Sequence, residues 1–159
     1  MIEDSLSPLI GLVTSPIFLS AFFGWFTAQF IKTIILLFKM RPKGGKDILV
    51  SLLWTTGGMP SSHSSVVTAL TTSLGFKTGI DSPLFIVTLF LSILVIRDAL
   101  GVRRAAGVQA RAINQMASDM NDRLGTNHKP VKEINGHKAA EVTVGILLGL
   151  FLGIGFCSL

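Results

Sequence analysis

The chain has 159 residues, of which 49% are hydrophobic and only 14% charged, with 11 phenylalanines and no tyrosine. Soluble domains are about 25% charged, and a soluble domain of this length could not bury so much apolar surface. A soluble globular protein is therefore excluded. We expect a single integral membrane domain, 1–159. The net charge of +5 comes from clustered basic residues, which we attribute to membrane topology and an anionic ligand rather than to nucleic acid.

The N-terminal part of the chain is almost wholly apolar. Residues 16–39 are long enough to cross a bilayer, which takes about 20 residues, and the apolar segment before them is expected to lie in the interface or to re-enter. The first residues lack the basic stretch of a cleaved signal peptide. Gln29 and Lys32 are three apart and share a helix face. A lysine inside a span is costly and usually functional; the alternative is that Lys32 snorkels to the surface.

A basic loop, residues 39–46, leads toward the stretch Gly57-Gly58-Met59-Pro60-Ser61-Ser62-His63-Ser64-Ser65. Its glycines and proline oppose regular structure, and a second helix is expected over 62–79. The unpaired N–H groups and the dipole at a helix start bind phosphate. His63 in the same turn can move a proton near neutral pH. The alternative is a serine-capped helix with an incidental histidine.

The most hydrophobic span is predicted over residues 83–100, after a tight turn at 79–83. Residues 97–114 contain no proline and are rich in alanine, so the helix should continue past the membrane surface to about residue 114. Charged residues gather where this span ends, namely Arg97, Asp98, Arg103 and Arg104. Charges at that depth need partners or water. The alternative is a basic helix lying on anionic lipid head groups.

The last part of the chain is predicted to be a loop and then a fourth span. Residues 117–135 are polar and indicate the loop, and residues 139–157 indicate the span. This span carries Gly145, Gly149 and Gly153 at a spacing of four, with Gly155 nearby. Such a row favours close packing against a neighbouring helix and also invites self-association of the chain.

The order of the spans places all the motifs at one membrane face. Span one ends at the basic loop, span three returns to that side, and spans two and four start there. Nearly all Lys and Arg lie on this side, with only Lys77 opposite, so the positive-inside rule predicts a cytoplasmic motif face. The predicted fold is an all-α polytopic bundle of about four transmembrane helices, in the inner membrane of a cell.

The gathered residues predict a phosphoryl-transfer site. His137 and Glu141 are four apart and share a face, so the carboxylate can fix one imidazole nitrogen and leave the other free to attack; the alternative is a simple helix contact. His63 can protonate a leaving oxygen. Phosphate can be held by three cations and the helix start, namely Lys32, Arg103, Arg104 and the backbone at Ser62. This chemistry needs no metal and no cofactor.

A metal site is the competing interpretation. Its ligands would be His63, His137, Asp98 and Glu141. The surrounding cations would repel a divalent ion, and neither a His-Glu-x-x-His pattern nor paired cysteines occur. The single cysteine, Cys157, also excludes an internal disulfide framework. We therefore predict no metal.

Two of these motifs resemble those of a known superfamily. Pro60-Ser61-Ser62-His63 resembles the Pro-Ser-Gly-His motif of the type 2 phosphatidic acid phosphatases and vanadium haloperoxidases. Gly136-His137 with Glu141 resembles their nucleophile motif, a His followed four residues on by an Asp. The chain is most similar to the divergent branch of that family, small bacterial and plant membrane proteins. The matching positions are Gln29, Lys32, 57–64, Asp98, 101–107 and 136–142.

The resemblance implies a role for each site residue. His137 is the implied nucleophile, Glu141 its orienting carboxylate and His63 the general acid. Lys32 and either Arg103 or Arg104 are implied phosphate clamps, with Gln29 and Asp98 in support. The implied substrate is a lipid or isoprenoid phosphate among membrane lipids. The alternatives are a non-catalytic membrane module that binds phosphorylated lipid or partner proteins, and a haloperoxidase, which the membrane setting disfavours.

Overall fold

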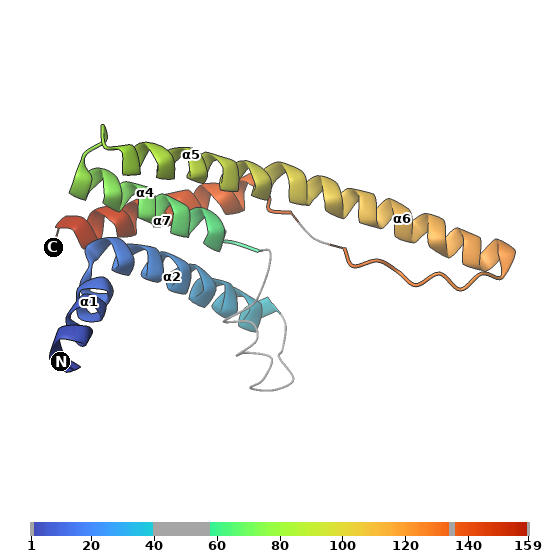
Figure 1. The fold of residues 1–159 in the computed structure, drawn as a ribbon. Coiled ribbons are helices and arrows are strands. Elements are labelled where there is room, and N and C mark those ends of the chain that lie inside the picture. The colour runs from blue at the N-terminus through green and yellow to red at the C-terminus, as the bar shows by residue number, and fades with distance from the viewer. Residues whose placement is uncertain (1, 40–57, 134–135, 159) are drawn as a thin grey trace.

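The computed structural model describes residues 2–39, 58–133 and 136–158, and these residues form helices and loops without a strand (Figure 1). The elements are α1 (Ile2–Thr14), α2 (Pro16–Lys39), α4 (Ser62–Thr78), α5 (Pro83–Arg97), the π-helical turn η1 (Asp98–Val102), α6 (Arg103–Leu124) and α7 (Ala139–Ser158). The all-α prediction is thus confirmed. Residues 40–46 of the predicted basic loop, and Gly57 of the central motif, lie outside the described residues.

Three stretches are long and apolar enough to cross a membrane, namely Pro16–Ile35, Pro83–Leu124 and Ala139–Ser158. The fourth crossing of the predicted bundle is α4, which has 17 residues and is rich in serine and threonine. It can be polar because it lies in the middle of the bundle, where α2, α5 and α7 all pack against it. The segment before the first span is a helix, α1, set at an angle to α2 (Figure 1).

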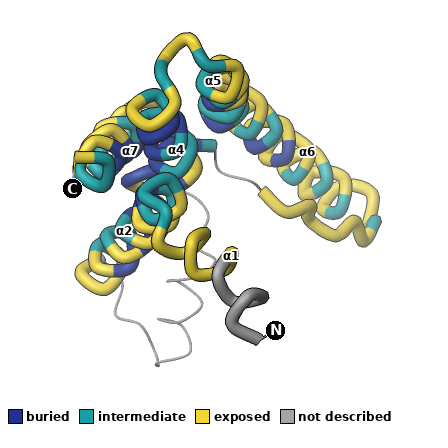
Figure 2. Tube along the Cα trace, turned by 60° about the vertical axis from the view of Figure 1, so that its left-hand side comes forward, coloured by how far each residue is buried: buried dark blue, intermediate teal, exposed yellow. Residues whose placement is uncertain are grey.

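The bundle has small polar residues inside and large apolar residues outside. Buried positions of α4 include Ser64, Ser65, Ala69 and Ser73, whereas Phe90 of α5 is 63% exposed. Figure 2 shows this pattern along α4 and the outward faces of its neighbours. Lipid rather than water covers such an outer surface in a membrane, and small residues let the helix backbones approach one another.

Hydroxyl groups tie α4 to two of its neighbours. The Ser65 hydroxyl donates to the Gly24 carbonyl of α2 at 2.9 Å. The Thr71 and Ser92 hydroxyls, from α4 and α5, lie 2.7 Å apart. These hydrogen bonds give partners to hydroxyl and carbonyl groups that are buried away from water.

The glycine row of α7 packs against α4 in the same chain. A Cβ on Gly145 would lie 2.5 Å from the Ser61 carbonyl oxygen, and one on Gly153 would lie 2.7 Å from the Cβ of Thr72. Only glycine allows this approach, because real Cβ atoms essentially never come so close to other atoms. The neighbouring helix predicted for the row is therefore α4. Gly155, by contrast, faces open space.

The helix directions bring the motif-bearing ends together. In Figure 1, α2 and α5 run toward the end of the bundle from which α4 and α7 start, while the N- and C-terminal ends of the chain lie at the opposite end. The predicted gathering of the motifs at one face of the bundle is thus confirmed.

The prediction of a loop over residues 117–135 is wrong in its first part, because α6 continues to Leu124. Met116, Met120 and Leu124 keep the spacing of a helix face, and the polar residues between them are mostly exposed. The helix ends at Gly125, whose φ of 64° is the left-handed conformation typical of a helix C-cap.

The segment after α6 returns along that helix, held by two asparagines seven residues apart. The Asn121 side chain donates to the His128 carbonyl at 3.0 Å and accepts from the His128 N–H at 2.8 Å. Asn114 does the same with Val131, at 3.0 Å and 2.8 Å. Asparagine is a weak helix former, but here its amide pairs with the returning segment as a backbone group would.

Candidate active site

The site is built where the first turns of α4 and α7 meet. The Ser61 N–H donates to the Glu141 carbonyl oxygen at 2.9 Å. The Ser61 hydroxyl accepts from the Ser64 N–H at 3.4 Å and so caps α4. Since Gly145 also sits on Ser61, the central motif is fixed against the first two turns of α7.

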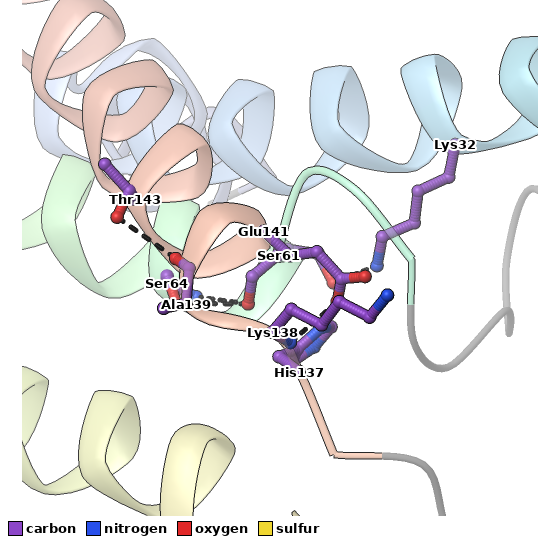
Figure 3. A network of polar contacts seen from close by, with 9 residues as sticks. Lys32, Ser61, Ser64, His137, Lys138, Ala139, Glu141 and Thr143 are labelled. Carbon is purple, nitrogen blue, oxygen red and sulfur yellow. Dashed lines mark hydrogen bonds and ion pairs between the residues drawn. The ribbon is translucent and has the colours of Figure 1, made fainter.

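His137 is held on two sides. Its Nδ1 lies 2.9 Å from Oε2 of Glu141 (Figure 3), and its backbone N–H donates to the Ala99 carbonyl at 3.1 Å. Glu141 also accepts the Lys138 N–H at 3.3 Å. The side chain of His137 is 6% exposed. A carboxylate at Nδ1 favours the tautomer that carries its proton there, which leaves Nε2 as the unprotonated nitrogen.

Lys32 points into the site from α2 (Figure 3). Its side chain is 5% exposed, and Nζ donates to the Ser62 hydroxyl at 3.3 Å. The Glu141 carboxylate is close enough to attract the positive charge of Lys32. The lysine therefore does not snorkel to the surface. One turn earlier, Gln29 is also buried, and its Oε1 has no hydrogen-bond partner among the described residues.

A π-helical turn places an ion pair beside the site. In a regular α-helix, side chains five positions apart point in directions that differ by about 140° around the helix axis. In η1 the wider turn brings Arg103 back over Asp98, and the Arg103 Nε donates to Asp98 Oδ2 at 2.8 Å. Single π turns inside α-helices occur frequently at functional sites.

His63 is exposed at the centre of the gathered charges. The charged or titratable groups that act on it are Lys32, Asp98, Arg103 and His137. Arg104 is not among them. Its backbone instead lies under Gly136, where a Cβ would be 2.5 Å from the Arg104 nitrogen. The structure thus brings the sequence-predicted site residues to one end of the bundle, with Arg103 among the charged groups that act on His63.

Sequence reasoning missed three parts of this arrangement. The π turn at 98–102 has no recognisable sequence signal beyond the five-residue spacing of Asp98 and Arg103. The bond from Ser61 to Glu141 depends on the packing of α4 against α7. The close approach of Gly136 to α6 could have been suspected from a glycine directly before the histidine. Within the described ranges, no three His, Cys, Asp or Glu side chains are grouped to hold a metal ion.

The chain is similar to a known protein family and to a bacterial membrane protein. A family profile described as "Divergent PAP2 family" matches residues 13–152, a range that contains every candidate site residue. An uncharacterized membrane protein of Bacillus subtilis (strain 168), YuiD, is 42% identical over 113 residues, which cover 64% of this chain and 72% of that protein. No solved structure matches the chain significantly.

Proposed function

Since the chain belongs to the divergent PAP2 family, a group of membrane proteins related to phosphatases, we propose that it hydrolyses a lipid or isoprenoid phosphate monoester through a phosphohistidine. The observation that carries the proposal is the His137–Glu141 contact of 2.9 Å beside a buried lysine. It supplies an oriented nucleophile next to a fixed positive charge, which are the two requirements of metal-independent phosphoryl transfer.

In the first step, Nε2 of His137 attacks the phosphorus atom. The ester P–O bond breaks, and His63 gives its proton to the leaving alcohol oxygen. The phosphoryl group is then bound to His137. Glu141 stabilises the positive imidazole, as the carboxylate of a catalytic triad does.

In the second step, a water molecule attacks the phosphorus atom and loses its proton to His63. The P–N bond breaks, inorganic phosphate leaves, and both histidines regain their starting states. The ammonium of Lys32, the guanidinium of Arg103 and the N–H groups at the start of α4 hold the phosphoryl oxygens through both steps.

We place this site at the cytoplasmic face of the inner membrane, because the basic residues gather at the motif end. Single cysteines in a Cys157→Ser background test the placement. In right-side-out vesicles, a membrane-impermeant maleimide should label Ile80→Cys, at the opposite end of the bundle, and leave Lys129→Cys unlabelled. The reverse pattern would put the site outside.

The activity is tested by phosphate release from a panel of lipid and isoprenoid phosphates, with purified protein and a chelator present. We expect release that vanadate inhibits and that His137→Ala abolishes while the protein stays folded. Turnover retained by His137→Ala would refute the phosphohistidine. Saturable binding of a lipid phosphate without turnover by the wild type would instead favour the non-catalytic binding module.

A further inference from the structure

Among the described residues, two of the apolar grooves on the side of the bundle lie between pairs of its helices. The first, which we call the α2–α7 groove, has a volume of about 330 Å³, and its lining includes Ile35, Met59, Pro60, Val144, Leu147 and Phe151. The second, the α4–α5 groove, has a volume of about 670 Å³, and its lining includes Thr68, Phe85, Leu89, Ile96 and Leu150. Both are candidates for holding a hydrocarbon chain.

The α2–α7 groove is lined by neighbours of candidate site residues on every element that forms it. On α2, Ile31 and Ile35 flank Lys32. In the loop before α4, Pro60 directly precedes Ser61. On α7, Val144 is three residues after Glu141 and lies on the same face of that helix. The lining of this groove therefore includes close sequence neighbours of Lys32, Ser61 and Glu141, and on α7 it extends to Phe151.

The α4–α5 groove reaches Ile96, two residues before Asp98, but none of its lining residues neighbours Lys32, Ser61 or Glu141 along the chain. Its first lining residue on α4 is Thr68, five residues beyond His63, which corresponds to about 7.5 Å along the helix. It then extends to Ile80 in the turn at the opposite end of the bundle. Its larger volume alone does not connect it to the phosphate-binding residues.

We propose that the α2–α7 groove binds one hydrocarbon chain of the substrate while Lys32 binds the phosphate, so that the substrate enters sideways from the bilayer. This inference rests on the proposed function. The hydrocarbon chain of a lipid is already surrounded by apolar molecules in the bilayer. The groove therefore binds it through shape and close contact rather than through the hydrophobic effect. Its effect is to orient the phosphorus atom toward His137, because a bound chain limits how the head group can turn.

Two tryptophan variants of α7 test the groove. Leu147→Trp fills the α2–α7 groove, and Leu150→Trp, three residues later on the same helix, fills the α4–α5 groove and serves as the matched control. The measured quantity is kcat/KM for dioleoyl phosphatidic acid in mixed micelles, divided by kcat/KM for water-soluble p-nitrophenyl phosphate.

We expect Leu147→Trp to lower this ratio on the order of 10- to 100-fold and Leu150→Trp to leave it within about twofold of the wild type. An unchanged ratio for Leu147→Trp would overturn the proposal, as would a loss confined to Leu150→Trp. If the wild-type protein hydrolyses neither substrate, the proposed function itself is wrong.

A second measurement uses the wild-type chain and needs no turnover. A phosphatidic acid with a diazirine midway along one chain is photolysed with the protein in vesicles, and the labelled residues are mapped. We expect labels at Leu147 and Phe151 that unlabelled phosphatidic acid displaces and that diacylglycerol does not. Labels confined to Leu150 and Phe85, or equal displacement by diacylglycerol, would overturn the proposal.

Discussion

Replacing Gly149 by alanine tests how far the site depends on the contact between α4 and α7. A Cβ at this position would lie 2.8 Å from the Cβ of Thr68 and 2.9 Å from the backbone nitrogen of Ala69. Ordinary contact begins at 3.4 Å. The nearest atom would be the Ser65 carbonyl oxygen, closer still than Thr68, so the two helices must separate by at least about 0.6 Å (3.4 − 2.8 Å). Backbone atoms on α4 cannot turn aside as a flexible side chain can.

The size of the effect follows from two opposing contributions. Adding a methyl group to a tightly packed interface costs about 1–3 kcal/mol, whereas alanine favours a helix over glycine by about 1 kcal/mol. Gly155→Ala is the matched control, because no atom lies within 4 Å of its added Cβ and only the favourable contribution remains. We thus expect Gly149→Ala to be less stable than Gly155→Ala by about 1–3 kcal/mol.

The same substitution should lower activity, because α7 carries Glu141 and follows His137, while α4 carries His63. A misplacement of about 1 Å can cost about 100-fold in rate, so we expect on the order of 10- to 100-fold for Gly149→Ala. The assay is thermal inactivation in detergent micelles together with hydrolysis of p-nitrophenyl phosphate. Equal stability and activity of the two variants would refute the reasoning about the glycine contact.

Three further substitutions probe the site and the segment that follows α6. Glu141→Gln should lower kcat by about 10²–10⁴-fold without unfolding the protein, because a neutral amide no longer stabilises the imidazolium; an unchanged kcat would contradict the pairing. Arg103→Ala should lower kcat/KM about 10²–10³-fold, while Arg104→Ala should leave it nearly unchanged, and the opposite order would reverse the assignment. Asn121→Ala removes bonds worth about 0.5–1.5 kcal/mol each, so limited trypsin digestion at Lys129 should speed up several-fold with activity unchanged.

Composition and spacing were enough to predict the helices and the face on which the site lies. A chain with so many apolar residues must place them against lipid, and once the spans are counted the direction of each follows. This is why residues as distant in sequence as Lys32 and His137 could be assigned to one end of the bundle. The glycine spacing on the last span likewise predicted close packing, although not which helix would fill the contact.

The rest depends on information that local patterns do not carry. The polar residues from Ser118 to Asp122 read as a loop, because weak helix formers dominate there; the structure keeps them helical since Asn114 and Asn121 find partners in the returning chain. The choice between Arg103 and Arg104 depends on the wide turn at 98–102, which shifts both side chains around the helix. The residue spacing within each segment shows neither the hydrogen-bond partners of the two asparagines nor the π-helical turn.

That wide turn also changes how a one-residue insertion or deletion would act in this protein. Each residue of a regular helix adds about 100° of rotation, so removing one residue from 98–102 would turn the whole of α6 by about that angle relative to α5. The row of Ile113, Met116 and Met120, exposed on α6, would then face another direction, although no loop had changed length. Among relatives, a single-residue gap here would mark a reorientation of the projecting helix.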